Sequence, residues 1–442
     1  MVTSNHSEVQ LPAVSQAVAP PALLRKVMAA SFVGNFVEWY DYAVYSYLAA
    51  TIGDVFFPKS DRTTQLLAAF AVFAVSFVIR PLGGLVWGHY GDKIGRRTAL
   101  SLSILIMSGA TFCMALIPGY AQVGLWGAVI LLVVRLVQGF SAAGEYAGAS
   151  AFLAEYAPEG KRGLYVSTVP ASTAAGLLFG SLLVALLSAL ISTDQMQSWG
   201  WRLPFLLAAP LGLIGRYIRL KLEDTPKFRE LELRHDAKNT PLKDLFTNHR
   251  RAILIAFGVT LLNAVGFYLV LTYMPTYLSE ELNVSTTESF IATSVTLFIY
   301  IFLIFIMGTL SDRFGRKRVL IAAGVGFALL TVPLFYALGA VGIVGMVAIE
   351  IVLAALLTLN DGTLASFLSE IFPTRVRYSG FAFSFNSANA LFGGTAPFVA
   401  TLLIKLTGSK IAPAWYLVAA AIVAVATMAF AKETAKDPLP DA

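Results

Sequence analysis

The sequence predicts an all-α integral membrane protein in which twelve transmembrane helices form two six-helix bundles. Of its 442 residues, 57% are hydrophobic and only 13% are charged, against roughly 25% charged in an ordinary soluble domain. Its apolar runs reach the ~20 residues that a helix needs to cross a bilayer, and they lack the strict alternation of barrel strands. A charged loop motif also recurs half a chain length later, which indicates two similar halves.

Twelve apolar segments are long enough to cross the membrane as helices. In the first half they lie near residues 27–52, 65–88, 98–117, 123–147, 164–190 and 202–220. In the second half they lie near residues 252–278, 289–309, 318–338, 341–366, 378–405 and 413–431. We therefore expect a disordered N-terminal tail at 1–24, a bundle at 25–220, a linker at 221–251, a second bundle at 252–431 and a short tail at 432–442.

The distribution of basic residues predicts the orientation. If each segment crosses the membrane once, most of the 32 Lys and Arg residues lie on the same side as the N-terminus. Loops rich in these residues stay in the cytoplasm. We expect a multi-pass protein of the cell inner membrane with both termini in the cytoplasm. The net charge of +6 is largely this topology signal, so we expect no nucleic-acid partner.

The sequence offers little material for cofactor or metal chemistry. Its lone Cys113 forms no intramolecular disulfide, and its four histidines are far apart, whereas metal frameworks place such residues at short spacings. A Gly-x-x-x-x-Gly-Lys-Ser/Thr phosphate loop does not occur. We expect no cofactor, no metal, no enzymatic activity and no obligatory protein partner, only the lipid bilayer and a small-molecule substrate.

The recurring motif is Gly-x-x-x-Asp-x-x-Gly-Arg-Arg/Lys, in the loops after the second and eighth segments. Glycine permits a tight turn and a close helix approach, and Asp can pair with Arg to lock helix ends together. Such a lock can break when two halves rock, so the motif predicts a cytoplasmic gate. Its residues are Gly88, Asp92, Gly95, Arg96 and Arg97 in the first copy and Gly308, Asp312, Arg313, Gly315 and Arg316 in the second.

A second motif, Glu-x-x-Pro followed by Arg, recurs in the same way. Glu155 and Arg162 belong to the copy after the fourth segment, and Glu370 and Arg377 belong to the copy after the tenth. Two motifs repeated at the half-chain spacing indicate parallel repeats about an axis normal to the membrane. Secondary transporters with such repeats hold their substrate near the midplane, between the halves.

The first motif resembles the loop signature of the major facilitator superfamily, and the resemblance covers the whole chain as a twelve-helix repeat. A stretch of the fourth segment, Leu131-x-x-x-Arg135-x-x-Gln138-Gly139-x-x-Ala142-Ala143, resembles a pattern of the proton-coupled members of that superfamily. Together the two resemblances imply a symporter with a proton as the second partner.

Ionisable residues inside membrane spans are costly and mark transport pathways or proton relays. Glu38 and Asp41 lie roughly 18 to 22 Å into the first segment, near the middle of the bilayer, and Arg135 lies at comparable depth. We expect the two carboxylates to bind the proton and a cationic group, Arg135 to bind a carboxylate or take part in coupling, and Tyr42 and Tyr45 to hold an ammonium. Static ion pairs and aromatic packing are the alternatives.

Other ionisable residues leave alternatives open. Glu145 is either a substrate contact or part of the internal gate, and Arg80 is expected to be structural or snorkelling. Glu350 takes the place of Arg135 in the second repeat, and this inversion of charge hints that the two residues pair across the halves. The tenth segment also contains Asp361.

Further stretches resemble the metabolite:proton symporter family, at residues 36–41, 79–84, 138–146 and 199–205. Within that family, the chain most resembles the bacterial proline/betaine transporters, at residues 144–163, 271–278 and 372–378. This implies alternating-access symport of a proton with a small zwitterion such as proline or glycine betaine. The family also includes α-ketoglutarate, citrate and shikimate carriers, so a proton symporter of an organic acid is the alternative.

Two features depart from the family pattern. Ala143 stands where the family usually has the first glycine of Gly-Gly-Glu, and the added methyl group is expected to reshape the cavity. The enterobacterial osmosensing member has a long C-terminal coiled coil, whereas this chain has only the tail at 432–442, so osmotic activation is not expected from the resemblance alone.

Overall fold

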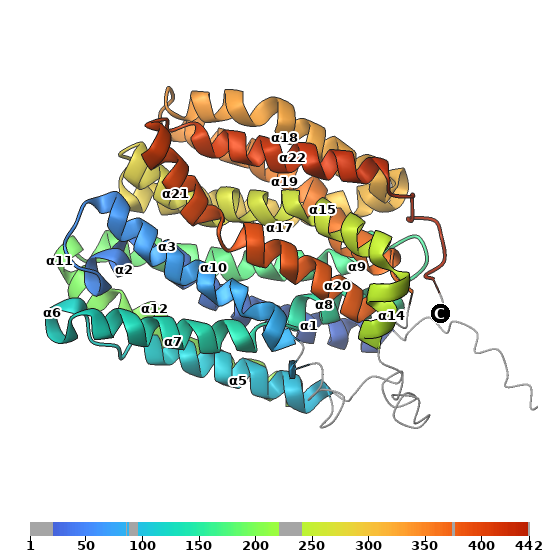
Figure 1. Cartoon of the computed structure of the whole chain (residues 1–442), viewed down its shortest axis with the longest axis horizontal. Coiled ribbons are helices and arrows are strands. Elements are labelled where there is room, and N and C mark those ends of the chain that lie inside the picture. The colour runs from blue at the N-terminus through green and yellow to red at the C-terminus, as the bar shows by residue number, and fades with distance from the viewer. Residues whose placement is uncertain (1–20, 85, 88–95, 221–240, 374–375, 441–442) are drawn as a thin grey trace, which may run out of the picture.

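The computed structural model describes residues 21–84, 86–87, 96–220, 241–373 and 376–440 (Figure 1). These residues form helices and connecting turns, with no strand among them. Nine of the helices in the described ranges are long and apolar enough to cross a membrane. The predicted all-α membrane fold is confirmed.

The first half of the chain contains six helical segments, several of them in two pieces. They are α1 (Pro21–Tyr47) with α2 (Ala49–Phe56), α3 (Arg62–Val78), α5 (Arg96–Met114), α7 (Leu125–Ser141) with α8 (Glu145–Tyr156), α9 (Arg162–Val166) with α10 (Thr168–Leu190), and α12 (Arg202–Leu220). Short elements connect some of them: α6 (Tyr120–Val123), α11 (Thr193–Gln195) and η1 (Met196–Gly200).

The second half begins with α14 (Pro241–Asn248) and repeats the six-segment plan. The segments are α15 (Arg250–Phe267) with η2 (Tyr268–Tyr273), α16 (Met274–Thr276) and η3 (Tyr277–Glu281); α17 (Thr286–Phe314); α18 (Arg316–Leu338); α19 (Ile343–Glu370); α20 (Arg377–Ala388) with η4 (Asn389–Gly393) and α21 (Ala396–Thr407); and α22 (Ala412–Ala429). Local π-helical turns such as η2 and η4 are frequent at functional sites.

The two halves lie side by side with their long helices roughly aligned (Figure 1). The helix pairs α10 with α17 and α3 with α21 form contact lines between the halves, and Ser181 of α10 shares a hydrogen bond of 2.9 Å with Ser294 of α17. We call the two ends of the molecule the α14 end, where α14 and the C-terminus lie, and the α6 end, where α6 and α11 lie.

Glycines permit the close approach of α7 to α3 and to the residues that follow α3. A Cβ atom on Gly139 would lie only 1.9 Å from the carbonyl oxygen of Ser76, and one on Gly83 only 2.1 Å from that of Phe140. Backbone packed this closely leaves no room for a methyl group, so any side chain would force the helices apart.

We expect Gly139→Ala to destabilise the protein, because overpacking of this kind costs about 1–3 kcal/mol. The measurement is the midpoint of thermal unfolding of the detergent-solubilised protein. Gly109→Ala on α5 is the matched control, since nothing lies within 4 Å of its would-be Cβ, and its midpoint should stay at or slightly above that of the wild type. Equal midpoints for the two variants would contradict the close crossing.

Candidate functional site

A cluster of charged side chains lies buried among the helices of the first half. Glu38 and Asp41 project from α1, Arg80 follows the end of α3, and Arg135 lies on α7. The exposed fractions of these four residues are 2%, 0%, 3% and 0%, respectively. Charges this deeply buried are stable only when they are paired or hydrogen-bonded, so the contacts of each one define what the cluster can do.

Glu38 pairs with Arg80. The Arg80 Nη2 atom lies 3.2 Å from Glu38 Oε1, and its Nε donates to the Tyr42 hydroxyl at 3.3 Å. The guanidinium also stacks on the rings of Tyr42 and Phe77, at 4.3 and 4.4 Å from the ring centroids. Of the two expected roles of Arg80, snorkelling is wrong, because the side chain turns inward to a carboxylate one helix away that offsets its buried charge. The buried ion pair agrees with a structural role.

Arg135 binds neutral oxygens. Its guanidinium donates to Ser76 Oγ at 3.0 Å and to the side chain of Gln138, and Gln138 Nε2 donates in turn to Thr111 Oγ1 at 2.8 Å. Glu350 contacts Thr293 instead, at 3.4 Å, so the suggested pairing of Arg135 with Glu350 across the halves is wrong. The opposite charges at these two corresponding positions therefore do not pair: Arg135 has partners in the first half, and Glu350 has a partner in the second.

Asp41 differs from Glu38 because neither of its carboxyl oxygens accepts a hydrogen bond from a described residue. Thr111 lies beside it, and the Thr111 hydroxyl also lies 3.1 Å from the Met107 carbonyl oxygen, which competes for its one proton. Arg135 and Glu38 are its charged neighbours. An ionised carboxylate in this position lacks the donors that would stabilise its charge.

The tyrosines of α1 face the arginines. The guanidinium carbon of Arg135 lies 4.2 Å from the ring centroid of Tyr45 and 5.2 Å from that of Tyr42, and the Tyr45 hydroxyl donates to the Ala69 carbonyl oxygen at 3.0 Å. Both rings thus have cationic partners within the protein. Their predicted role in binding a substrate ammonium would require these guanidinium groups to move.

Glu145 lies where the fourth segment is interrupted. It begins α8 after the break at 142–144, and it lines with Glu38 a small cavity of about 10 Å³, roughly the room of one water molecule. Helix α20 of the second half holds the break, since Tyr378 and Asn386 donate to the carbonyl oxygens of Gly144 and Ala143 at 3.1 and 3.0 Å. The break therefore links the charged cluster to the interface between the halves.

The second copy of the loop motif closes the halves at the α14 end. The Asp312 carboxylate accepts hydrogen bonds from the backbone N–H groups of Gly163 and Leu164 at 2.7 and 3.0 Å, across the interface. Arg316 supports it with an ion pair of 2.8 Å. Gly308 permits the approach, because a Cβ there would lie 2.6 Å from the Gly163 carbonyl oxygen.

The remaining motif residues have different placements. Gly315 adopts a positive φ of 100° at the turn between α17 and α18, a conformation that favours glycine. Arg313 is exposed and contacts the neighbouring Phe314 ring. In the first copy, Gly88, Asp92 and Gly95 lie outside the described residues, and Arg96 and Arg97 begin α5 with side chains that are likewise outside the description.

The second repeated motif adds two ion pairs between the halves at the same end. Arg162 lies 3.1 Å from Glu370, and Arg377 lies 2.8 Å from Glu155, so each copy supplies the partner of the other. Glu370 also pairs with Arg316 at 3.0 Å. Glu370 thus joins the two motifs into one network of charges that spans the halves, and the Arg377–Glu155 pair lies at the same end.

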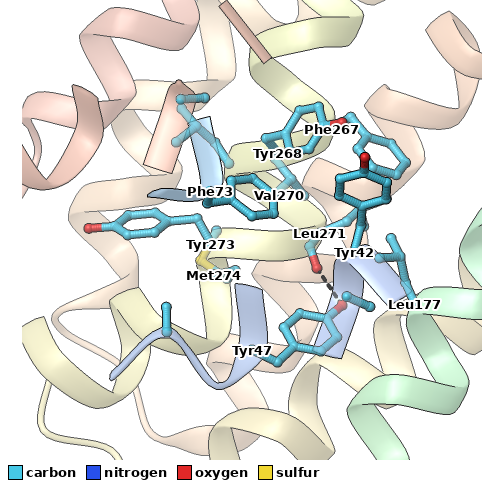
Figure 2. Close-up of a cluster of buried hydrophobic side chains, with 14 of the residues drawn as sticks. Tyr42, Tyr47, Phe73, Leu177, Phe267, Tyr268, Val270, Leu271, Tyr273 and Met274 are labelled. Atoms are coloured by element: carbon cyan, nitrogen blue, oxygen red, sulfur yellow. Dashed lines mark hydrogen bonds between the residues drawn. The ribbon is translucent and has the colours of Figure 1, made fainter. Parts of the chain in front are cut away.

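The halves are also joined at the α6 end and in the middle. Arg62 of α3 makes two hydrogen bonds of 2.8 Å to Glu280 of η3, and Lys405 donates to Thr64 Oγ1 at 2.8 Å. Closer to the centre, the Tyr47 hydroxyl donates to the Leu271 carbonyl oxygen at 2.8 Å (Figure 2). With both ends joined, the structure is an occluded state.

We expect Asp312→Asn to loosen the closure at the α14 end, because hydrogen bonds to a charged acceptor contribute about 1.5–3 kcal/mol each. The measurement is the maleimide labelling rate of a cysteine placed at Ser167, which is 1% exposed, in detergent-solubilised protein with Cys113→Ser. The rate should rise several-fold. Arg313→Gln, a change at the exposed neighbour, should leave it unchanged, and equal rates in both variants would contradict the role of Asp312.

The chain is similar in sequence to known transporters. The family model described as "Sugar (and other) transporter" matches residues 26–245 and 229–441. The glycine betaine/proline/ectoine/pipecolic acid transporter of Dickeya dadantii is 41% identical over 426 residues, which cover 94% of this chain and 85% of the relative. The proline/betaine transporter of Escherichia coli strain K12 is 39% identical over the same coverage.

Solved structures show the same fold. The proton:xylose symporter of the major facilitator superfamily matches with a TM-score of 0.77 at 18% identity, covering 95% of this chain and 98% of its own. A partially occluded, inward-open conformation of the xylose transporter of E. coli matches with a TM-score of 0.73 at 19% identity, covering 95% and 100%. The chain therefore belongs to the sugar (and other) transporter family and has the fold of the major facilitator superfamily.

Proposed function

We propose that this multi-pass membrane transporter carries a small zwitterion of the proline or glycine betaine type into the cell together with a proton. The substrate class is supported by the names of the relatives at 39–41% identity. We further propose that it lies in the bacterial inner membrane with both termini in the cytoplasm, as the distribution of Lys and Arg indicates. The α14 end, where the C-terminus lies, would then be the cytoplasmic end.

The observation that carries the proton coupling is the position of Asp41. It is 0% exposed and neither of its oxygens is hydrogen-bonded within the described residues, whereas Glu38 nearby is paired with Arg80. Burying an ionised carboxylate without donors costs several kcal/mol, and protonation removes that charge. Asp41 is thus the group at which a proton can be held, and its neighbours must offset the negative charge of Asp41 when the proton leaves.

Alternating access follows from the two closures. The bundles at 25–220 and 252–431, joined by the linker at 221–251, would rock about the buried centre. Breaking the network around Asp312 and Glu370 would open the cytoplasmic side, and breaking the Arg62–Glu280 contact would open the other. The Arg62–Glu280 contact is partly exposed and can be exchanged for water at modest cost. The Arg316–Glu370 pair is buried, so its opening requires that water enter and hydrate both charges.

The rival substrate class, an organic acid, would need cationic side chains that can reach it. Arg80 is paired with Glu38, and Arg135 is bound by Ser76, Gln138 and two tyrosine rings. Both arginines of the charged cluster are thus engaged within the protein. This favours a zwitterion, whose carboxylate requires less cationic charge than a di- or tricarboxylate.

Asp41→Asn should abolish accumulation of labelled glycine betaine in proteoliposomes under an inward proton gradient while retaining betaine exchange at equilibrium, because the amide mimics the neutral, protonated carboxyl group. Asp194→Asn, at an exposed position of α11, is the matched control and should accumulate betaine like the wild type. Proton-driven accumulation by Asp41→Asn would refute the coupling role. If the wild type accumulates α-ketoglutarate but neither betaine nor proline, the substrate class is the rival one.

A further inference from the structure

A second cavity lies between the two halves, apart from the cluster around Asp41. It has a volume of about 10 Å³ in this occluded state. Its lining is rich in aromatic rings and amides and contains one carboxylate, with no Lys or Arg among the described residues that form it. The residues are Trp39, Tyr146, Pro170 and Thr173 from the first half and Asn263, Phe267, Asp361, Phe385 and Asn389 from the second.

Asp361 is held in place by its own half. It is 2% exposed and lies on α19, where Asn263 of α15 donates to Oδ1 at 2.6 Å and the Tyr300 hydroxyl of α17 donates to Oδ2. Two neutral donors fix the orientation of the carboxylate without cancelling its charge. When ionised, it presents a negative charge to the cavity, whereas the carboxylate of Glu38 is already neutralised by Arg80.

The aromatic residues complete a site for a cation with apolar substituents. Tyr146 of α8 stacks on Phe385 of α20 at 4.6 Å between ring centroids, and Trp39 of α1 contacts Phe267 of α15 at 5.0 Å. Both pairs join opposite halves. Aromatic faces around a carboxylate attract quaternary and secondary ammonium groups, and the cavity would gain these ring faces when the halves part enough to admit a ligand.

Trp39 also offers a donor for the opposite pole of a zwitterion. It is 4% exposed, and its indole Nε1 has no hydrogen-bond partner among the described residues. The guanidinium carbon of Arg80 lies 5.9 Å from its ring centroid. With Asp41 protonated, Arg80 and Arg135 exceed the one ionised carboxylate, Glu38, so the net charge of the cluster in the first half is positive. A zwitterion would thus lie with its carboxylate toward α1 and its ammonium toward α19.

We propose that Asp361 binds the ammonium group of the zwitterion, with the rings of Trp39, Tyr146, Phe267 and Phe385 surrounding its methyl or ring carbons. The proposal rests on the proposed function and specifies its ligand site. It moves the ammonium from the α1 tyrosines, which face Arg80 and Arg135, to the second half. The bound substrate would then bridge the halves and replace the Tyr146–Phe385 stack.

The test is ligand binding by the purified full chain, measured as the shift of its thermal unfolding midpoint with ligand concentration. Glycine betaine is compared with tert-butylacetate, which has the same shape but carbon in place of the charged nitrogen. In Asp361→Asn, the Asn263 contact can remain and Tyr300 can switch from donor to acceptor, so we expect a folded protein. Its Kd for betaine should rise roughly tenfold or more, and its preference for betaine over tert-butylacetate should be lost.

Glu350→Gln is the matched control, because Glu350 is a buried carboxylate on the same helix that does not line the cavity. It should keep the preference for betaine. Phe385→Leu gives a second measurement. It should weaken the binding of betaine several-fold and have less effect on the binding of tert-butylacetate. An unchanged preference in Asp361→Asn, or an equal loss in Glu350→Gln, would overturn the proposal. If the wild type binds neither betaine nor proline, the proposed function itself fails.

Discussion

The buried charges of the first half constrain everything else in this molecule. Two carboxylates on α1, one arginine just after α3 and one on α7 lie in an apolar interior, where an unpaired charge costs several kcal/mol. The close crossing of α3 and α7 at glycines brings the two arginines near α1. Arg80 is then paired with Glu38, and Arg135 is hydrogen-bonded to neutral side chains. Among the described residues, none donates a hydrogen bond to Asp41, so its protonation state is coupled to the arrangement of its neighbours.

This constraint connects the centre of the molecule to its ends. Helix α1 carries the two carboxylates of the charged cluster and also contributes Trp39 and Tyr47 to the interface between the halves. The break before Glu145 receives hydrogen bonds from α20, and α8 continues from there toward Glu155 and its partner Arg377. A rearrangement of the cluster therefore has direct structural routes to the closure at the α14 end. Substrate bound between Trp39 and Asp361 would act on the same helices from the other side.

Much of the fold could be predicted from the sequence, because bilayer thickness fixes the length of apolar segments and the repeated motifs indicate two similar halves. The buried positions of Glu38, Asp41 and Arg135 followed from counting residues along helices. The contacts between these side chains could not be predicted this way. Arg80 pairs with Glu38, the α1 tyrosines stack on arginines, and Glu350 contacts Thr293 and not Arg135. These depend on how helices distant in sequence are rotated against each other. Asp361 was visible as a buried charge, but its aromatic surroundings come from both halves.

The most direct test of proton coupling is to follow external pH with an impermeant dye when glycine betaine is added to proteoliposomes containing only the wild-type protein, without an imposed pH gradient and with the membrane potential clamped at zero. The account predicts that the medium becomes more alkaline as betaine enters, and that a protonophore abolishes this change. Betaine entry at the same rate with no movement of protons would contradict it.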